Sequence, residues 1–170
     1  MTASGTDVAD LLPAGTNIVT VQPTSVEYYR AVAQAFARGL TLDGKQLGPV
    51  NPWLVGVAFH GSSGRMEHCV VRGFRLATGV GGVGFGAGNW PYLGRSPQQV
   101  RVDDNYFEDN GAAVGFAPGG ADPGEVRLRF HVQGNTIVGL GPTDTDTQTG
   151  IFARDGTTGE ISDNTITGLN

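Results

Sequence analysis

A short phrase that recurs in the C-terminal part of the chain limits the fold more than any other feature of the sequence. The phrase reads Asn-Thr-Ile-x-Gly at positions 135–139 and 164–168, and weaker copies surround Asn105 and Cys69. Successive Asn or Cys positions are 36, 30 and 29 residues apart. Each copy is short, rich in β-branched residues and followed by glycine, a pattern that predicts a strand and then a turn.

A second phrase alternates with the first. It combines Val or Ile with Phe and occurs at positions 57–59, 83–85, 114–116 and 151–153. Two interleaved strand types with a period of about thirty residues predict a solenoid in which every period adds one coil.

These alternating phrases resemble the right-handed parallel β-helix, or pectin-lyase-like, superfamily. Residues 40–44 followed by 56–59 look like an early coil of the same kind, so the resemblance covers roughly residues 39–170. It implies an all-β fold, a right-handed single-stranded parallel β-helix of about four to five turns, with carbohydrate as the default ligand class. The superfamily includes lyases, hydrolases, epimerases and non-catalytic proteins, so the fold does not decide the function.

The N-terminal region has a different pattern. Residues 1–16 are small and polar and are expected to be flexible, whereas residues 17–21 alternate as a strand does. Thr24 and Glu27 fit a capping box, and apolar residues up to Arg38 follow a helical period. We therefore expect residues 17–38 to form a strand and a helix that caps the first coil of a single 39–170 domain, since an exposed sheet edge invites pairing. Partner binding is the alternative role for this helix.

Composition excludes several function classes. The net charge of −5 and the lack of a block of basic residues in the sequence predict no basic surface for binding nucleic acid. No apolar run is long enough to span a bilayer, and the first residues lack the features of a signal peptide. Cys69 is the single cysteine, so no internal disulfide forms. We expect no membrane or nucleic-acid partner, no metal and no cofactor; the location, cytoplasmic or secreted after leader removal, stays open.

Residues one period apart are expected to stack in columns with a spacing of about 4.8 Å. Two inward columns form the predicted core: Met66, Val102, Val132 and Ile161, and Val71, Phe107, Ile137 and Ile166. The Asn phrase places Cys69, Asn105, Asn135 and Asn164 in one corner column. We expect these asparagines to take up left-handed backbone and to form a hydrogen-bonded ladder.

One candidate site lies on the outward side of the Asn-bearing strands. Its two columns are Arg65, Arg101, His131 and Glu160, and Glu67, Asp103, Gln133 and Ser162. Arg101, Asp103 and His131 are predicted to meet around one ligand, where an imidazole beside a carboxylate suits acid–base chemistry. The alternative is a row of exposed ion pairs, each contributing about 0–1 kcal/mol.

A second candidate site lies on the other strand type. Its outward positions are predicted to be Ala58, Gly84, Gly115 and Phe152, and then His60, Gly86, Ala117 and Arg154. Small residues expose backbone to a ligand. The long 86–99 loop carries Trp90 and Tyr92 as an aromatic wall, with the catalytic candidate His60 and the binding candidates Arg154 and Phe152 at the rim. Trp53, in the 44–54 loop, is a further contact candidate, and the alternative is that the 86–99 loop covers this floor itself.

Three functions follow as hypotheses. The first is a carbohydrate-binding or carbohydrate-modifying protein. The second is an isomerase- or cyclase-type enzyme for another small molecule, with His60 or His131 as acid or base. The third is a non-catalytic structural or oligomerisation module. Ile161 and Ile166 are expected to form an apolar C-terminal end, covered by further chain or by a second copy in a two-fold homodimer.

Overall fold

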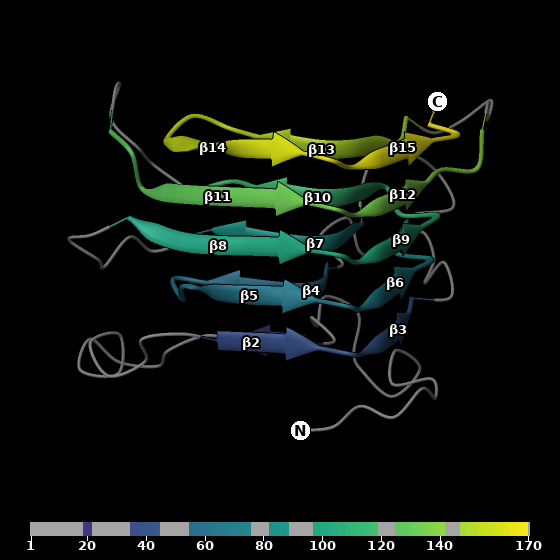
Figure 1. Ribbon diagram of the computed structural model, residues 1–170, viewed down its shortest axis with the longest axis horizontal. Coiled ribbons are helices and arrows are strands. Elements are labelled where there is room, and N and C mark those ends of the chain that lie inside the picture. Colours follow the sequence, from purple (N-terminus) through teal and green to yellow (C-terminus); the bar gives the residue numbers. More distant parts are fainter. Residues whose placement is uncertain are drawn as a thin grey trace.

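The chain folds into three parallel β-sheets of five strands each that wind around one core (Figure 1). The structure is a computed structural model, and it describes residues 19–21, 35–44, 55–75, 82–88, 97–118, 125–141 and 147–169. Sheet A contains β1 (Val19–Val21), β4 (Val55–His60), β7 (Val83–Gly88), β10 (Ala112–Phe116) and β13 (Thr149–Ala153). Sheet B contains β2 (Ala35–Arg38), β5 (Gly64–Glu67), β8 (Gln98–Asp103), β11 (Leu128–Gln133) and β14 (Thr157–Ser162). Sheet C contains β3 (Thr41–Asp43), β6 (Val70–Arg72), β9 (Tyr106–Glu108), β12 (Thr136–Val138) and β15 (Thr165–Thr167).

The order of these strands along the chain confirms a parallel β-solenoid. The chain passes through sheets A, B and C in turn and then returns to sheet A beside the strand that it left. Every strand pair is parallel, as in β10 with β7 and β13. The described residues contain no helix, and none of them forms a segment suited to crossing a membrane as a helix.

The predicted capping helix is wrong at its C-terminal end. Ala35–Arg38 form strand β2, which pairs with β5, and residues 22–34 of the prediction lie outside the described part of the chain. In β2 the side chain of Ala37 is buried and that of Phe36 is exposed, which is the alternation of a strand. A short segment with alanine and one aromatic residue fits both the helical period and the strand period. Pairing with β5 therefore decides that this segment is a strand. The strand expected within residues 17–21 is confirmed as β1.

The two predicted inward columns form the core over most of the solenoid. Met66, Val102 and Val132 are fully buried, whereas Ile161 of the last described coil is 51 % exposed. Phenylalanine rings add a stack inside sheets A and B, with centroid distances of 5.2 Å for Phe59–Phe85, 6.3 Å for Phe85–Phe116 and 4.4 Å for Phe116–Phe130. Within the described coils the core is therefore continuous along the axis, and burial decreases at the last of them.

The predicted register of β7 is wrong by two residues. Gly86, not Gly84, pairs with Ala58 and with Gly115. Gly84 is buried, and a Cβ at this position would lie 3.0 Å from the Phe107 ring. The phrase Val-Gly-Phe at 83–85 is identical to the phrase at 114–116, which suggested that the two phrases pair directly. In the observed register both Phe85 and Ala87 face the core.

The asparagine ladder is confirmed as a structural feature. Asn135 Oδ1 accepts hydrogen bonds from the backbone N and the Nδ2 of Asn105, each at 2.9 Å, and Asn164 Oδ1 accepts the same pair from Asn135. The left-handed backbone, however, lies one residue earlier than predicted. It occurs at His68, Asp104 and Asp163, with Gly39 and Gly134 in the same column. Each asparagine side chain can therefore turn inward, because the residue before it adopts the left-handed conformation that turns the chain at the corner.

Buried amides also fill the other two corners, which the sequence did not reveal. Gln98 Nε2 donates to the carbonyl oxygens of Phe59 at 3.0 Å and Ser62 at 2.6 Å. Asn110 Oδ1 accepts a hydrogen bond from the backbone N of Phe74 at 3.0 Å. Gln148 Oε1 accepts a hydrogen bond from the backbone N of Leu140 at 2.8 Å. These single residues do not repeat, so no sequence period marks them.

Candidate functional site

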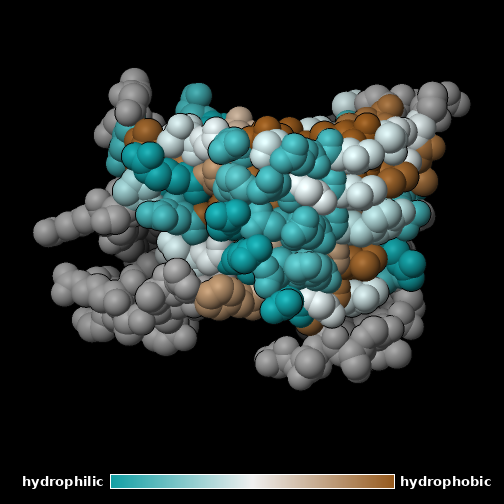
Figure 2. All heavy atoms as spheres, viewed as in Figure 1, coloured by the Kyte–Doolittle hydropathy of each residue, from teal (hydrophilic) through white to brown (hydrophobic). Residues whose placement is uncertain are grey.

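The outward face of sheet B carries the polar columns that the sequence predicts. Strand pairing aligns Arg65, Arg101, His131 and Glu160 in one column and Glu67, Asp103, Gln133 and Ser162 in the next. Hydrophilic side chains cover the middle of this face, over β5, β8 and β11 (Figure 2). Alternation along each strand directs these side chains away from the core, while their neighbours along the strand fill it.

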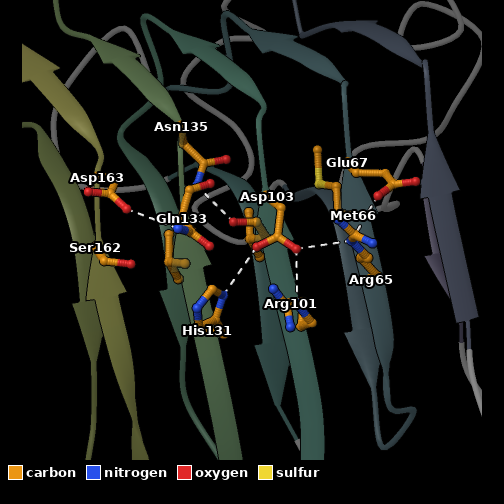
Figure 3. A network of polar contacts seen from close by, with 12 residues as sticks. Arg65, Met66, Glu67, Arg101, Asp103, His131, Gln133, Asn135, Ser162 and Asp163 are labelled. Atoms are coloured by element: carbon orange, nitrogen blue, oxygen red, sulfur yellow. Dashed lines mark hydrogen bonds and ion pairs between the residues drawn. The ribbon is translucent and has the colours of Figure 1, made fainter.

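Asp103 is the centre of a charged cluster in which Arg65, Arg101 and His131 converge on one carboxylate (Figure 3). Its Oδ2 lies 3.0 Å from the Nε of Arg65 and 3.0 Å from the Nε of Arg101. Its Oδ1 lies 3.3 Å from Nδ1 of His131. A carboxylate only accepts hydrogen bonds, so Nδ1 carries the proton of this contact and Nε2 is left for another partner.

Burial differs strongly within this cluster. The side chain of Asp103 is 5 % exposed, against 24 % for His131 and 53 % for Arg101. The exposed guanidinium adds little stability by its ion pair, about 0–1 kcal/mol. Loss of the buried carboxylate has a different effect, because it removes the common anchor of three side chains. The structure thus brings together the three residues predicted to meet and adds Arg65.

Glu67 extends the cluster toward the first coil. Its Oε2 lies 2.8 Å from the Nε of Arg65, and its Oε1 lies 3.3 Å from the Nε of Arg38. Two carboxylates of this face, Glu67 and Asp103, are thus engaged by arginines. Gln133 points the other way, since its Nε2 donates to Asp163 Oδ2 at 2.9 Å.

An open groove of about 510 Å³ lies beside this cluster on sheet B. It is lined by Phe36, Ser63, Gly64, Arg65, Gln99, Val100, Arg101, Arg129, Phe130 and His131. Val100 is 1 % exposed, so the strands contribute backbone to the floor while arginines and the imidazole form the walls. Among the lining residues that the structure describes there is no carboxylate. The groove is thus a cationic surface of a size usual for small-molecule sites.

Arg129 and Phe36 belong to this groove and were missed by sequence reasoning. Arg129 stands two residues before His131 on β11 and pairs with Gln99 of β8, so the alternation that selected His131 also selects Arg129. Within the described part of the chain, its guanidinium has no carboxylate partner. Phe36 was missed because its segment was assigned to a helix.

The second candidate site is only partly described. Trp53, Trp90 and Tyr92 and the side chain of His60 lie outside the described residues. A Cβ at Gly115 would meet the Phe152 ring, so this ring covers the glycine, and Arg154 lies 5.8 Å from the centre of the same ring. Ala58, in the same column, is also fully buried. The small-residue column is therefore closed at Ala58 and Gly115.

Cys69 is a buried thiol. Its Sγ donates to the Glu67 carbonyl oxygen at 3.3 Å, and burial raises its pKa above the ordinary thiol value. A raised pKa lowers the fraction of nucleophilic thiolate near neutral pH. Among the described residues no group of three or more His, Cys, Asp and Glu side chains is arranged to hold a metal ion.

Comparison with known proteins gives no relative for this chain. No protein-family model matches it. No curated protein sequence matches it. No solved structure matches it.

Proposed function

We propose that the protein binds an acidic oligosaccharide in the groove on sheet B. The observation that carries this proposal is the groove lining, in which three guanidinium groups and one imidazole face the same open space and none of the described lining residues is a carboxylate. Arginine pairs with carboxylates and sulfates through two parallel hydrogen bonds, so it suits recognition of such groups. The superfamily resemblance, which implies carbohydrate as the ligand class, points in the same direction.

The arrangement of the cations favours an extended ligand that lies along the solenoid axis. Arg65, Arg101 and His131 stand in consecutive coils of one column, with a spacing of about 4.8 Å between neighbours. Arg129 lies in the adjacent column and widens the cationic strip. The 69 % exposed Phe36 of the groove offers an apolar surface to a sugar ring.

Arg129 has the largest expected role in affinity, because no carboxylate among the described residues has to be displaced from it. Arg65 and Arg101 are already held by Asp103 and present their remaining N–H groups to the groove. The net charge of −5 opposes general attraction of anions. Binding therefore depends on this local cluster and not on the charge of the whole chain.

Calorimetric titration with acidic and neutral oligosaccharides of equal length tests this proposal. We expect the acidic series to bind and Arg129→Gln to weaken binding by about 10- to 100-fold, since a hydrogen bond to a charged group contributes about 1.5–3 kcal/mol. Arg72→Gln is the matched control, because Arg72 is an exposed arginine on sheet C that pairs with Asp43 at 2.9 Å. Equal binding of neutral and acidic chains, or equal affinities of the two variants, contradicts the proposal.

Acid–base chemistry in the same groove is a second candidate function, and the contact between His131 and Asp103 favours it. The buried carboxylate fixes Nδ1, so Nε2 is available to exchange a proton with a bound ligand. The described residues of the lining do not include the pair of groove-facing carboxylates that most glycoside hydrolases use. His131→Gln should abolish turnover of an acidic oligosaccharide while leaving its binding measurable, whereas unchanged turnover excludes this role.

A further inference from the structure

Two arginines of the groove are held at their Nε atoms by the same carboxylate. Arg101 Nε donates a hydrogen bond to Asp103 Oδ2 at 3.0 Å. Arg65 Nε lies 3.0 Å from the same oxygen and 2.8 Å from Glu67 Oε2, and it is buried from solvent. A guanidinium group can bind an anion through Nε–H and one terminal N–H, or through its two terminal nitrogens. The Nε side of both arginines is occupied, so the terminal nitrogens remain for a ligand.

The two guanidinium groups are also neighbours. Arg65 and Arg101 pair across β5 and β8, so they stand in adjacent coils of one column, about 4.8 Å apart. Both flank one oxygen atom of Asp103 (Figure 3). The side chain of Asp103 is 5 % exposed, whereas those of Arg65 and Arg101 are 39 % and 53 % exposed. A buried carboxylate therefore holds a pair of arginines that line the open groove.

We propose that this arginine pair binds a tetrahedral ester group, a sulfate or a phosphate, in preference to a carboxylate. This preference rests on the proposed binding of an acidic oligosaccharide in the groove, and it specifies the acidic group that such a ligand carries. A sulfate or phosphate ester has three terminal oxygens, so it can accept hydrogen bonds from both guanidinium groups at once. A carboxylate has two oxygens, and a single arginine engages both of them in the paired geometry.

The surroundings of the arginine pair suit an ester group that is carried by a sugar. Strand pairing places Phe36 before Arg65 and His131 after Arg101 in the same column. The exposed Phe36 ring can support the sugar whose ester group contacts the neighbouring Arg65. Because Asp103 already holds both arginines, little side-chain freedom is lost when the ligand binds.

Arg129 provides a comparison within the same groove. No carboxylate among the described residues forms an ion pair with it, so none closes the Nε side of its guanidinium group. Arg129 can therefore engage a carboxylate and a sulfate by the same paired geometry. We expect Arg129 to contribute affinity for all acidic chains, and Arg65 with Arg101 to select among the acidic groups.

Calorimetric titration of the wild-type protein tests this preference. The ligands are oligosaccharides of one backbone and one length that are neutral or carry carboxylate, sulfate ester or phosphate ester groups. We expect the sulfated or the phosphorylated series to bind about 10-fold more tightly than the carboxylated series, because the ester gains one further hydrogen bond to a charged group. Comparison of the two ester series shows which ester the groove selects.

Two lysine substitutions locate the preference. Arg101→Lys keeps the charge but loses the planar fork, so the preference for the ester over the carboxylate should disappear. Arg129→Lys is the matched control, because it should weaken binding of the ester and carboxylate series by similar factors and leave the preference unchanged. Arg101 is 53 % exposed, so its variant should keep the circular dichroism spectrum of the wild type.

The outcomes separate this preference from the proposed function. Carboxylated chains that bind the wild type as tightly as both ester series, or an Arg101→Lys variant that retains the preference, would overturn the role of the arginine pair while the binding of acidic chains stands. Acidic chains that bind no better than neutral chains would remove both.

Discussion

Replacement of Asn135 by alanine tests the physical basis of the solenoid. Asn135 is 1 % exposed, and its amide connects three consecutive coils. Its Oδ1 accepts from the backbone N and from the Nδ2 of Asn105, and its Nδ2 donates to the Val102 carbonyl oxygen at 2.8 Å and to Asn164 Oδ1 at 2.9 Å. Alanine removes all of these contacts and adds none.

The expected cost follows from the backbone groups that lose a partner. The backbone N of Asn105 and the carbonyl oxygen of Val102 both lie inside the corner, and an unsatisfied buried polar group costs about 1–3 kcal/mol. Partial relaxation and entry of water reduce the sum, so we expect Asn135→Ala to lower the free energy of unfolding by about 2–4 kcal/mol.

Urea denaturation followed by circular dichroism measures this loss, provided that the slope of the transition stays unchanged. Gln133→Ala is the matched control, because Gln133 lies two residues away and its amide donates to the exposed Asp163. Its expected cost is below about 0.5 kcal/mol. Equal losses for the two variants would refute the reasoning, since they would show that the ladder contributes no more than a surface contact.

Two further predictions concern single residues. Cys69 should react with an alkylating reagent much more slowly in the folded than in the unfolded protein at neutral pH, because burial raises its thiol pKa. As pH rises, the thiol of the unfolded chain loses its proton before the buried thiol does. The free energy of unfolding should therefore be unaffected by this thiol below a pH of about 8.5 and should decrease above it. Unfolding curves at several pH values measure this change. Gly139→Ala should destabilise the protein more than Gly141→Ala, because a Cβ at 139 would meet the carbonyl oxygen of Gly168 in the next coil. Gly141 has a φ of 80° but open space, so its cost should be only about 1–2 kcal/mol, and the reverse order of melting temperatures would contradict the observed spacing of the coils.

The fold was predictable where the sequence repeats. The Asn phrases recur with β-branched neighbours, so they set the register of sheets B and C and thereby the columns that contain Arg101, Asp103 and His131. The register of β7 was not predictable from its phrase, because Val83 and Phe85 match the wrong pair of residues in β10. Packing of Phe85 among other phenylalanine rings decides that register, and this is a property of the assembled core.

The candidate site was only half predictable for a similar reason. Alternation on β8 and β11 identifies Arg101 and His131, and the same rule would have identified Arg129. Phe36 was not accessible in this way, because a segment with alanine and one aromatic residue has a helical and a strand reading of equal weight. The central role of Asp103 depends on distances to three side chains from different coils, and spacing along the sequence does not contain them.

A structure of the protein with a bound acidic trisaccharide tests the central claim most directly. The account predicts the sugar along sheet B, with its acidic groups against Arg65, Arg101 and Arg129 and one oxygen or ring carbon near Nε2 of His131. A sugar bound instead over sheet A beside Phe152, or no bound sugar at a concentration that saturates binding in solution, would contradict it.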